Sequence, residues 1–431
     1  MWKLKLNMNH IGFYVVCLLI VCLLFGDAKS RQSLAITKEK AASLDYDEWP
    51  SSYGNMIDVP GTRIRVVWIL HDYVPFVNAG SEICAHTINT HLLKKPYLYD
   101  VWVGVPGYPN KTYEGVRCFN LYDTNTLFEV LKHSHIVMSH SYYYRQQVMW
   151  ISKKFGVPFV EWIHTDNYVR AVGTNWYDSK IKGRQWTVFN SESLKASRPD
   201  LPRNSIRIVR PPVDYRDYCL DVKTPEETQD NKDTPEPPKE QKETFGRKGY
   251  ITLSNVNENK GGKLLIQLAK AMPECEFLGI KGGYRKQLID TSLPNLRYIE
   301  HTTQIKDVYA QTWVLIMPSK EETWGRTAVE AMSSGIPIIV SPTPGLKECC
   351  GDAALYCDRQ DLSIWVKTIR KLKDDKEFYN QRSALALQRA RALDPTEELN
   401  QLEHWIQNDV LKSAVHTNRD CSSWEQSMLF R

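Results

Sequence analysis

The sequence offers little for binding a metal through cysteine. Its ten cysteines include no Cys-x-x-Cys pair, and only Cys349 and Cys350 stand together. No group of cysteines and histidines has the spacing of a metal site, so none is expected. The thiols are either buried and free, or paired in one or two disulfides of a lumenal protein. The sequence leaves both alternatives open.

Two other features are missing. The apolar run at residues 64–70 is not followed by Gly-x-Gly-x-x-Gly, which argues against a dinucleotide-dependent oxidoreductase. The chain also has no long stripe of lysine and arginine with interleaved aromatic residues, and its net charge of +5 is small for 431 residues. A nucleic-acid partner is therefore not expected.

One uncharged apolar run stands at the N-terminus, at residues 11–25, with Lys3 and Lys5 before it. It is shorter than the roughly 20 residues of a membrane-spanning helix. It suits the core of a signal peptide, with the small residues at 26–28 as a cleavage site. We expect residues 1–26 to be a signal-anchor or a signal peptide that brings the chain to a membrane, and residues 27–61 to be a polar stem.

Strand-like and helix-like segments alternate over the rest of the chain. Helices are expected at 81–95, 261–271, 326–334 and 395–411. Strands are expected at 64–70, 100–105, 135–140, 157–164, 185–190, 206–211, 249–256, 275–280, 296–300, 313–318, 336–341 and 354–357. Such alternation predicts an α/β protein with parallel sheets that are covered on both faces.

Residues 223–248 interrupt this alternation, because they are charged, contain proline and have almost nothing apolar to bury. We therefore expect two domains with a linker between them. The predicted boundaries are 62–214, 215–248 for the linker, 249–394, and 395–431 for a C-terminal helix and tail. Ligands of open α/β sheets bind beyond the carboxyl ends of the strands, so the expected site is the cleft between the domains.

Two glutamates flank a glycine after the apolar run at 313–318. If a helix begins near Gly325, Glu322 lies in the loop before it and Glu330 in its second turn. A helix N-terminus presents free N–H groups and a partial positive charge to an anion, and carboxylates accept hydrogen bonds from sugar hydroxyls. The arrangement suits a phosphate ester of a sugar, although an ordinary helix with an acidic first turn has the same spacing.

The residues around these glutamates resemble a known family. Residues 318–337 read PSKEETWGRTAVEAMSSGIP, with Pro344, Gly345 and Glu348 beyond them. This stretch is similar to the E-x7-E segment of the retaining GT-B glycosyltransferases of family 4, the glycosyl transferases group 1. The resemblance extends over roughly residues 62–410 and is looser in the first half. It implies two Rossmann-like parallel-sheet domains that face each other across a cleft.

The resemblance also implies an activity and a set of site residues. A hexose would pass from a nucleoside-diphosphate sugar to an acceptor with retention of anomeric configuration, without a metal or other cofactor. Lys260 matches the family's phosphate-binding lysine, whereas Asn255 stands where an arginine is usual. Glu322 is expected beside the donor sugar and Glu330 at the nucleotide ribose. The remaining residues implied are Gly325, Arg326 and Thr327 for donor binding, Gly80 and Ser81 in a small-residue loop facing the donor phosphate, and His164 near the transferred sugar.

The acceptor is left open among a glycan, a glycoprotein and a lipid-linked molecule. A body in the lumen of the endoplasmic reticulum or Golgi is favoured, and a secreted one follows if the N-terminal segment is cleaved. Two other functions are retained as alternatives. Asn255 is the best support for a membrane-anchored binding protein that has lost catalysis, and a nucleotide-sugar epimerase would share the fold.

Overall fold

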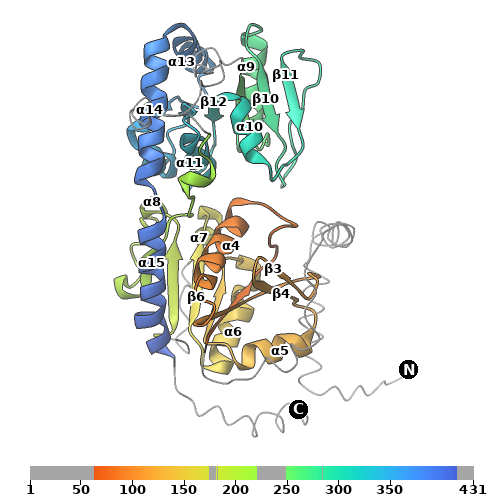
Figure 1. Cartoon of the computed structure of the whole chain (residues 1–431), viewed down its shortest axis with the longest axis vertical. Coiled ribbons are helices and arrows are strands. Elements are labelled where there is room, and N and C mark those ends of the chain that lie inside the picture. Colours follow the sequence, from red (N-terminus) through yellow and green to blue (C-terminus); the bar gives the residue numbers. More distant parts are fainter. Residues whose placement is uncertain (1–62, 174–180, 182, 221–248, 284, 415–431) are drawn as a thin grey trace, which may run out of the picture.

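The computed structural model describes residues 63–173, 181, 183–220, 249–283 and 285–414. They form two α/β domains, one above the other along the long axis of the molecule (Figure 1). The predicted N-terminal segment and stem, and most of the predicted linker, lie outside the described residues. Within the described ranges, no helix has both the length and the apolar character needed to cross a membrane.

The N-terminal domain is built on an eight-stranded sheet with the order β3-β4-β2-β1-β5-β6-β7-β8. Its strands are β1 (Ile64–Ile69), β2 (Tyr99–Val105), β3 (Lys111–Tyr113), β4 (Val116–Asn120), β5 (Ile136–Ser139), β6 (Phe159–Ile163), β7 (Gln185–Phe189) and β8 (Ile206–Ile208). All neighbouring strands are parallel except β3 and β4. Strands β2, β5 and β6 are buried at every position, as in a sheet covered on both faces.

The covering helices of this domain are α4 (Gly80–Leu93), α5 (Thr124–Lys132), α6 (Arg145–Phe155), α7 (Asp166–Val172) and α8 (Glu192–Lys195). The sequence analysis did not predict β3 or β4. These strands form a short antiparallel hairpin that turns through Glu114 and Gly115, both with positive φ. Strand β3 has only three residues, all partly exposed, so the sequence gives no alternating pattern there.

The C-terminal domain has a six-stranded parallel sheet with the order β11-β10-β9-β12-β13-β14. Its strands are β9 (Tyr250–Ser254), β10 (Phe277–Ile280), β11 (Leu296–Ile299), β12 (Thr312–Met317), β13 (Ile338–Val340) and β14 (Ala354–Tyr356). Its helices are α9 (Gly262–Ala271), α10 (Ile305–Gln311), α11 (Arg326–Ser333), α12 (Pro344–Cys350), α13 (Leu362–Asp374) and α14 (Lys376–Ala392). The strand order reverses between β9 and β12, where α/β sheets of this kind bind ligands.

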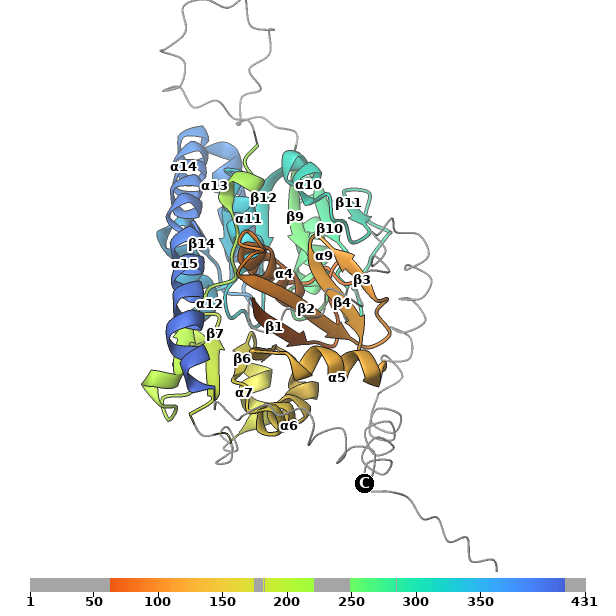
Figure 2. The same ribbon diagram turned by 60° about the horizontal axis from the view of Figure 1, so that its bottom comes forward.

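The chain returns to the N-terminal domain at its end. Helix α15 (Thr396–Trp405) continues into a π-helical turn at Ile406–Val410, which confirms the helix expected at 395–411. Leu402 and Trp405 belong to the same core cluster as β1, β2 and α4, and Lys95 forms an ion pair of 2.8 Å with Glu403. Figures 1 and 2 show α14 and α15 following each other along one side of the molecule, one on each domain.

The structure separates the two alternatives for the cysteines that it describes. Cys84, Cys118, Cys219, Cys275, Cys349, Cys350 and Cys357 are all free thiols, and only Cys219 among them is not buried. No disulfide joins any pair of these residues. The other three cysteines lie outside the described ranges.

Candidate functional site

The loop between β9 and α9 brings Lys260 to the carboxyl edge of the C-terminal sheet. Asn257 Oδ1 accepts a hydrogen bond of 2.9 Å from the Lys260 backbone N–H. Gly261 follows with φ of 100° and caps α9. A Cβ atom at this position would lie 2.3 Å from Pro318 Cγ. Only glycine combines this backbone conformation with so close an approach to the neighbouring strand end.

The side chains of Lys260 and Glu322 contact each other at this edge of the sheet. The Lys260 ammonium donates a hydrogen bond to Glu322 Oε2, and the side chains are 32% and 15% exposed. Glu322 lies in the loop between β12 and α11, so the two residues follow adjacent strands of the sheet. The sequence predicted both residues for one site, and the structure brings them together.

The loop that carries Glu322 also touches the N-terminal domain. Thr323 Oγ1 donates a hydrogen bond of 2.7 Å to the backbone carbonyl of His164. Asn190 Nδ2 donates to the same hydroxyl at 3.0 Å. His164 and Asn190 directly follow β6 and β7. The carboxyl ends of strands from both sheets therefore meet beside Lys260 and Glu322, which is where the cleft was expected.

Helix α11 begins at Arg326, so Glu322 precedes it and Glu330 lies in its second turn, as predicted. The Glu330 carboxylate is only 8% exposed and is contacted by protein groups. Tyr309 donates to Oε2 at 2.9 Å, Tyr218 donates to Oε1 at 3.4 Å, and Arg326 Nε lies 2.9 Å from Oε1. A ribose hydroxyl would have to share or displace these partners.

The other residues predicted on α11 have different surroundings. Arg326 donates hydrogen bonds to the Pro212 carbonyl and to the Tyr218 hydroxyl, so it ties α11 to the segment that leaves the N-terminal domain. Gly325 is the N-cap with φ of 125°, and a Cβ atom there would lie 2.7 Å from a Leu346 methyl group. Thr327 is partly buried in the first turn.

Asn255, which stands where the resembled family usually has an arginine, has an unusual backbone conformation and a local hydrogen bond. Asn255 has φ of 67°, and its Oδ1 accepts a hydrogen bond of 2.8 Å from Asn257 Nδ2. A Cβ atom on Gly282 would lie within 2.2 to 2.4 Å of the Asn255 amide group. The short asparagine side chain is therefore held against the backbone of residue 282 and adds no cation to the site.

Two predicted features of the N-terminal domain need correction or comment. Gly80 and Ser81 are the first residues of α4, so they begin a helix and do not lie in a loop as predicted. Ser81 Oγ donates a hydrogen bond of 2.8 Å to Glu82 Oε2.

Burial lowers the pKa of His164 to about 4, so its imidazole is neutral near pH 7. The hydrogen bond from Thr323 goes to the backbone carbonyl of His164 and not to its imidazole ring.

Several polar residues at the domain boundary received no site role in the sequence analysis. The Glu348 carboxylate accepts hydrogen bonds of 2.9 and 2.8 Å from the backbone N–H groups of Glu192 and Ser193. It thus binds the N-terminus of α8 from the opposite domain. His71 and His140, which lie at the start of the loops after β1 and β5, were also missed. The available signal for both was a histidine within two residues of the end of a buried strand.

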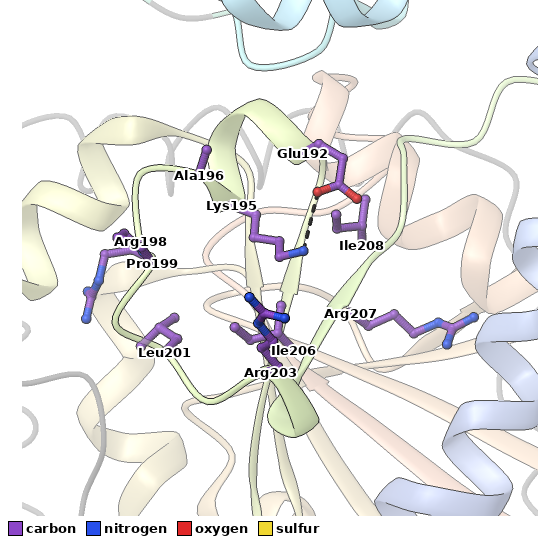
Figure 3. Close-up of a pocket in the computed structure, with 10 residues that line it drawn as sticks. All are labelled: Glu192, Lys195, Ala196, Arg198, Pro199, Leu201, Arg203, Ile206, Arg207 and Ile208. Carbon is purple, nitrogen blue, oxygen red and sulfur yellow. Dashed lines mark hydrogen bonds and ion pairs between the residues drawn. The ribbon is translucent and has the colours of Figure 1, made fainter.

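A groove elsewhere on the N-terminal domain carries several cationic side chains (Figure 3). It runs along α8 and the neighbouring β8, and Lys195, Arg203 and Arg207 are among its lining residues. None of the residues predicted for the site lines this groove. It is therefore separate from the Lys260–Glu322 pair.

The fold and the site together define a two-domain α/β protein. The sheet edge at which a ligand is expected to bind lies at the boundary between the domains. Residues 233–389 match the family model described as glycosyl transferases group 1. The matched segment includes Lys260, Glu322 and Glu330. The resemblance seen in the second half of the sequence is thus supported over this segment.

The solved structures that the chain resembles establish the fold as GT-B. A sucrose-phosphate synthase from Thermosynechococcus elongatus superimposes with a TM-score of 0.61 at 14% identity, covering 81% of this chain and 100% of that one. The Anabaena protein HepE, crystallised with UDP and glucose, superimposes with a TM-score of 0.60 at 13% identity over 80% of this chain and 100% of that one.

Shorter segments are similar to curated bacterial proteins. An O-antigen chain mannosyltransferase of Salmonella typhimurium is 34% identical over 80 residues, which are 18% of this chain and 23% of that protein. The mannosylfructose-phosphate synthase of Agrobacterium fabrum is 27% identical over 179 residues, which are 35% of this chain and 39% of that protein. The chain thus spans less than half the length of either relative.

Proposed function

We propose that this protein is a glycosyltransferase that moves a hexose from a nucleoside-diphosphate sugar to an acceptor, with retention of anomeric configuration. The observation that carries the proposal is the Lys260–Glu322 pair at the carboxyl ends of β9 and β12. It lies within the segment that matches the glycosyl transferases group 1 model. The transferase and synthase names of the relatives and the UDP–glucose complex of HepE support a sugar-nucleotide donor.

The charges of the site suit the departure of a diphosphate. Negative charge develops on the leaving diphosphate when the bond to the anomeric carbon breaks. Lys260 stabilises this charge, as do the free N–H groups at the start of α9 and α11, because they are already oriented before the reaction. No metal ion is invoked for this step. Glu322 then accepts hydrogen bonds from the hydroxyls of the sugar, next to the lysine that holds the phosphate.

The roles of the other predicted residues follow from their positions. Glu330 would bind the ribose if Arg326 and Tyr218 give up part of their contact with it. His164 is placed at the domain boundary by its backbone contact with Thr323, which suits a position near the transferred sugar. The acceptor would be a glycan, a glycoprotein or a lipid-linked molecule. Association with an endoplasmic reticulum or Golgi membrane through residues 11–25 belongs to the same proposal.

Hydrolysis of the donor in the absence of an acceptor tests this function. The full chain is incubated with UDP-, GDP- and ADP-hexoses, and the released nucleoside diphosphate is measured. We expect one donor class to be hydrolysed, and Lys260→Ala to reduce the rate by about 10²–10³-fold because a positive charge at the leaving group is lost. Lys263→Ala is the matched control, since Lys263 is an exposed lysine three residues further along the chain, in the first turn of α9.

Two results would contradict the proposal. One is a folded protein that neither binds nor hydrolyses any of these donors, which would favour the non-catalytic alternative. The other is hydrolysis that Lys260→Ala and Glu330→Ala leave unchanged, because the reaction would then occur at a different site.

A further inference from the structure

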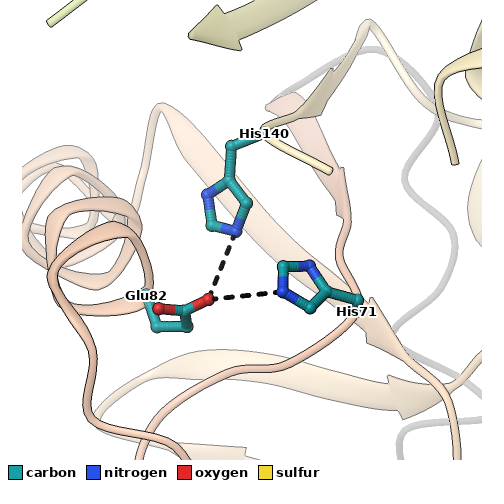
Figure 4. A group of neighbouring side chains, drawn as sticks. All are labelled: His71, Glu82 and His140. Carbon is teal, nitrogen blue, oxygen red and sulfur yellow. Dashed lines mark ion pairs between the residues drawn. The ribbon is translucent and has the colours of Figure 1, made fainter. Parts of the chain in front are cut away.

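Three ionisable side chains converge at the carboxyl edge of the N-terminal sheet (Figure 4). His71 follows β1 and His140 follows β5, which is its neighbour in the sheet. Glu82 lies in the first turn of α4. The Glu82 and His140 side chains are each only 1% exposed, whereas the His71 side chain is 33% exposed. The cluster is thus buried on one side and open on the other.

The ligand atoms of the three side chains surround a common point. Glu82 Oε1 lies 3.8 Å from His71 Nε2 and 3.7 Å from His140 Nε2, and the three atoms lie within 4.8 Å of one another. Ligand bonds of about 2.0–2.2 Å in a tetrahedral zinc site place the ligand atoms about 3.4 Å apart. Shifts of a few tenths of an ångström in these two contacts, with the two imidazole nitrogens brought to the same separation, would complete that geometry.

Hydrogen bonding does not account for the cluster. Distances of 3.7 and 3.8 Å between the carboxylate oxygen and the imidazole nitrogens exceed those of hydrogen bonds. In the described residues, Glu82 Oε1, His71 Nδ1 and both ring nitrogens of His140 are buried without a hydrogen-bond partner. A buried polar atom without a hydrogen-bond partner is unfavourable. A cation at the shared point would be bound by two of these atoms, Glu82 Oε1 and His140 Nε2, together with His71 Nε2.

The charged neighbours of the cluster point in the same direction. Among the described residues, the ion-pair contacts of Glu82 are with His71 and His140, and none is with a lysine or an arginine. Imidazole nitrogens and a carboxylate oxygen are the atoms through which such residues bind a metal. The Asp72 carboxylate lies 3.9 Å from His71 Nε2 and adds a further oxygen on the more exposed side.

We propose that His71, Glu82 and His140 form a binding site for a divalent cation of the zinc class. Two imidazoles and one carboxylate are the ligands of zinc sites that keep one coordination position open. The open position would face the domain boundary, because the His140 ring contacts that of His164 at 5.4 Å between centroids and His164 contacts the other domain. The site belongs to the domain opposite Lys260 and does not depend on the proposed reaction.

Metal binding by the full chain tests the proposal without any measurement of activity. The protein is treated with a chelator, dialysed, and titrated with Zn²⁺ and, separately, Mg²⁺ by calorimetry. Co²⁺ is then added to record the visible absorption of a tetrahedral complex. We expect one equivalent of Zn²⁺ to bind and Mg²⁺ to bind far more weakly, because its preferred ligands are oxygen atoms.

Three variants locate the site. His71→Gln and Glu82→Gln should each weaken Zn²⁺ binding by about 100-fold or more, since loss of a ligand exceeds the 10–100-fold effect of losing an outer partner. His86→Gln is the matched control, because His86 also contacts a carboxylate, that of Glu114 at 3.0 Å. Circular dichroism confirms that each variant is folded. Absence of a stoichiometric site, or equal Zn²⁺ binding by all three variants, would overturn the proposal.

Discussion

Gly345 allows the loop that carries Glu322 to pack closely against α12. It lies in the first turn of α12, directly against the loop that carries Glu322. A Cβ atom on Gly345 would lie 2.3 Å from the Thr323 carbonyl carbon and 2.4 Å from the Glu322 oxygen. These are backbone atoms, so a side chain could be accommodated only if the whole loop moved.

Gly345→Ala should therefore impair the proposed reaction. We expect donor hydrolysis to fall by at least tenfold, together with a loss of about 1–3 kcal/mol in the free energy of unfolding from overpacking. Parallel rate measurements and denaturant titrations would separate the two effects. Gly283→Ala is the control, since nothing lies within 4 Å of a Cβ atom there. An unchanged hydrolysis rate in Gly345→Ala would show that the position of this loop does not matter.

Tyr309 offers a second test at the residue scale. Its buried hydroxyl donates a hydrogen bond of 2.9 Å to Glu330. Tyr309→Phe should lower the free energy of unfolding by about 1–3 kcal/mol, because a buried carboxylate oxygen loses its donor. The same substitution in a Glu330→Gln background should cost clearly less. Equal costs in the two backgrounds would show that the Tyr309–Glu330 contact contributes nothing to stability.

Some of the residues discussed above could be singled out from the sequence, and others could not. Lys260, Glu322 and the start of α11 were predicted, because local motif order determines them. The partners of Glu330 could not be predicted, since Tyr218 and Tyr309 are brought to it only by tertiary packing. The His71–Glu82–His140 cluster was missed for the same reason, as its members come from three separate elements.

At the scale of elements, the sequence predicted all of the described strands except β3 and β4. Buried parallel strands give continuous apolar runs, whereas the β3–β4 hairpin is too short to give any pattern. The sequence analysis did not predict that the charged region after β14 forms two separate helices, α13 and α14. Asp375 ends the first helix and caps the second, accepting a hydrogen bond of 2.9 Å from the Phe378 N–H.

The packing of helix α15 is expected to contribute to the free energy of unfolding of the N-terminal domain. Trp405 is 6% exposed and packs edge to face on Trp186, with 5.5 Å between ring centroids. Trp405→Ala should reduce the free energy of unfolding by about 3–5 kcal/mol, as expected for truncation of a buried aromatic residue. Asn400→Ala, at an exposed position of the same helix, should have little effect. Similar stability for the two variants, measured by urea titration, would contradict this packing.

At the scale of the whole molecule, the two domains are joined by a few polar contacts beside the proposed site. Glu348 of the C-terminal domain accepts hydrogen bonds from the first N–H groups of α8, and Arg210 approaches the same carboxylate at 3.8 Å. These contacts hold the two strand edges together. They should therefore influence how readily the cleft closes on a donor.

Glu348→Ala should open the cleft without unfolding either domain. We expect a larger radius of gyration in X-ray scattering and a rise of about 3–10-fold in KM for the donor, equivalent to the net contribution of roughly one ordinary hydrogen bond. Glu276→Ala removes an exposed glutamate of the same domain and serves as the control. A radius of gyration and KM equal to those of the unmodified chain would show that Glu348 does not control closure.

Hydrogen exchange of the full chain, with and without its preferred nucleoside-diphosphate hexose, tests the central claim most directly. Donor binding between the domains should protect the backbone N–H groups of residues 255–262 and 319–330, which surround Lys260 and Glu322 in the C-terminal domain. Lys260→Ala should abolish that protection. Protection confined to other parts of the chain, or none with any donor, would contradict the assignment of this edge as the sugar-nucleotide site.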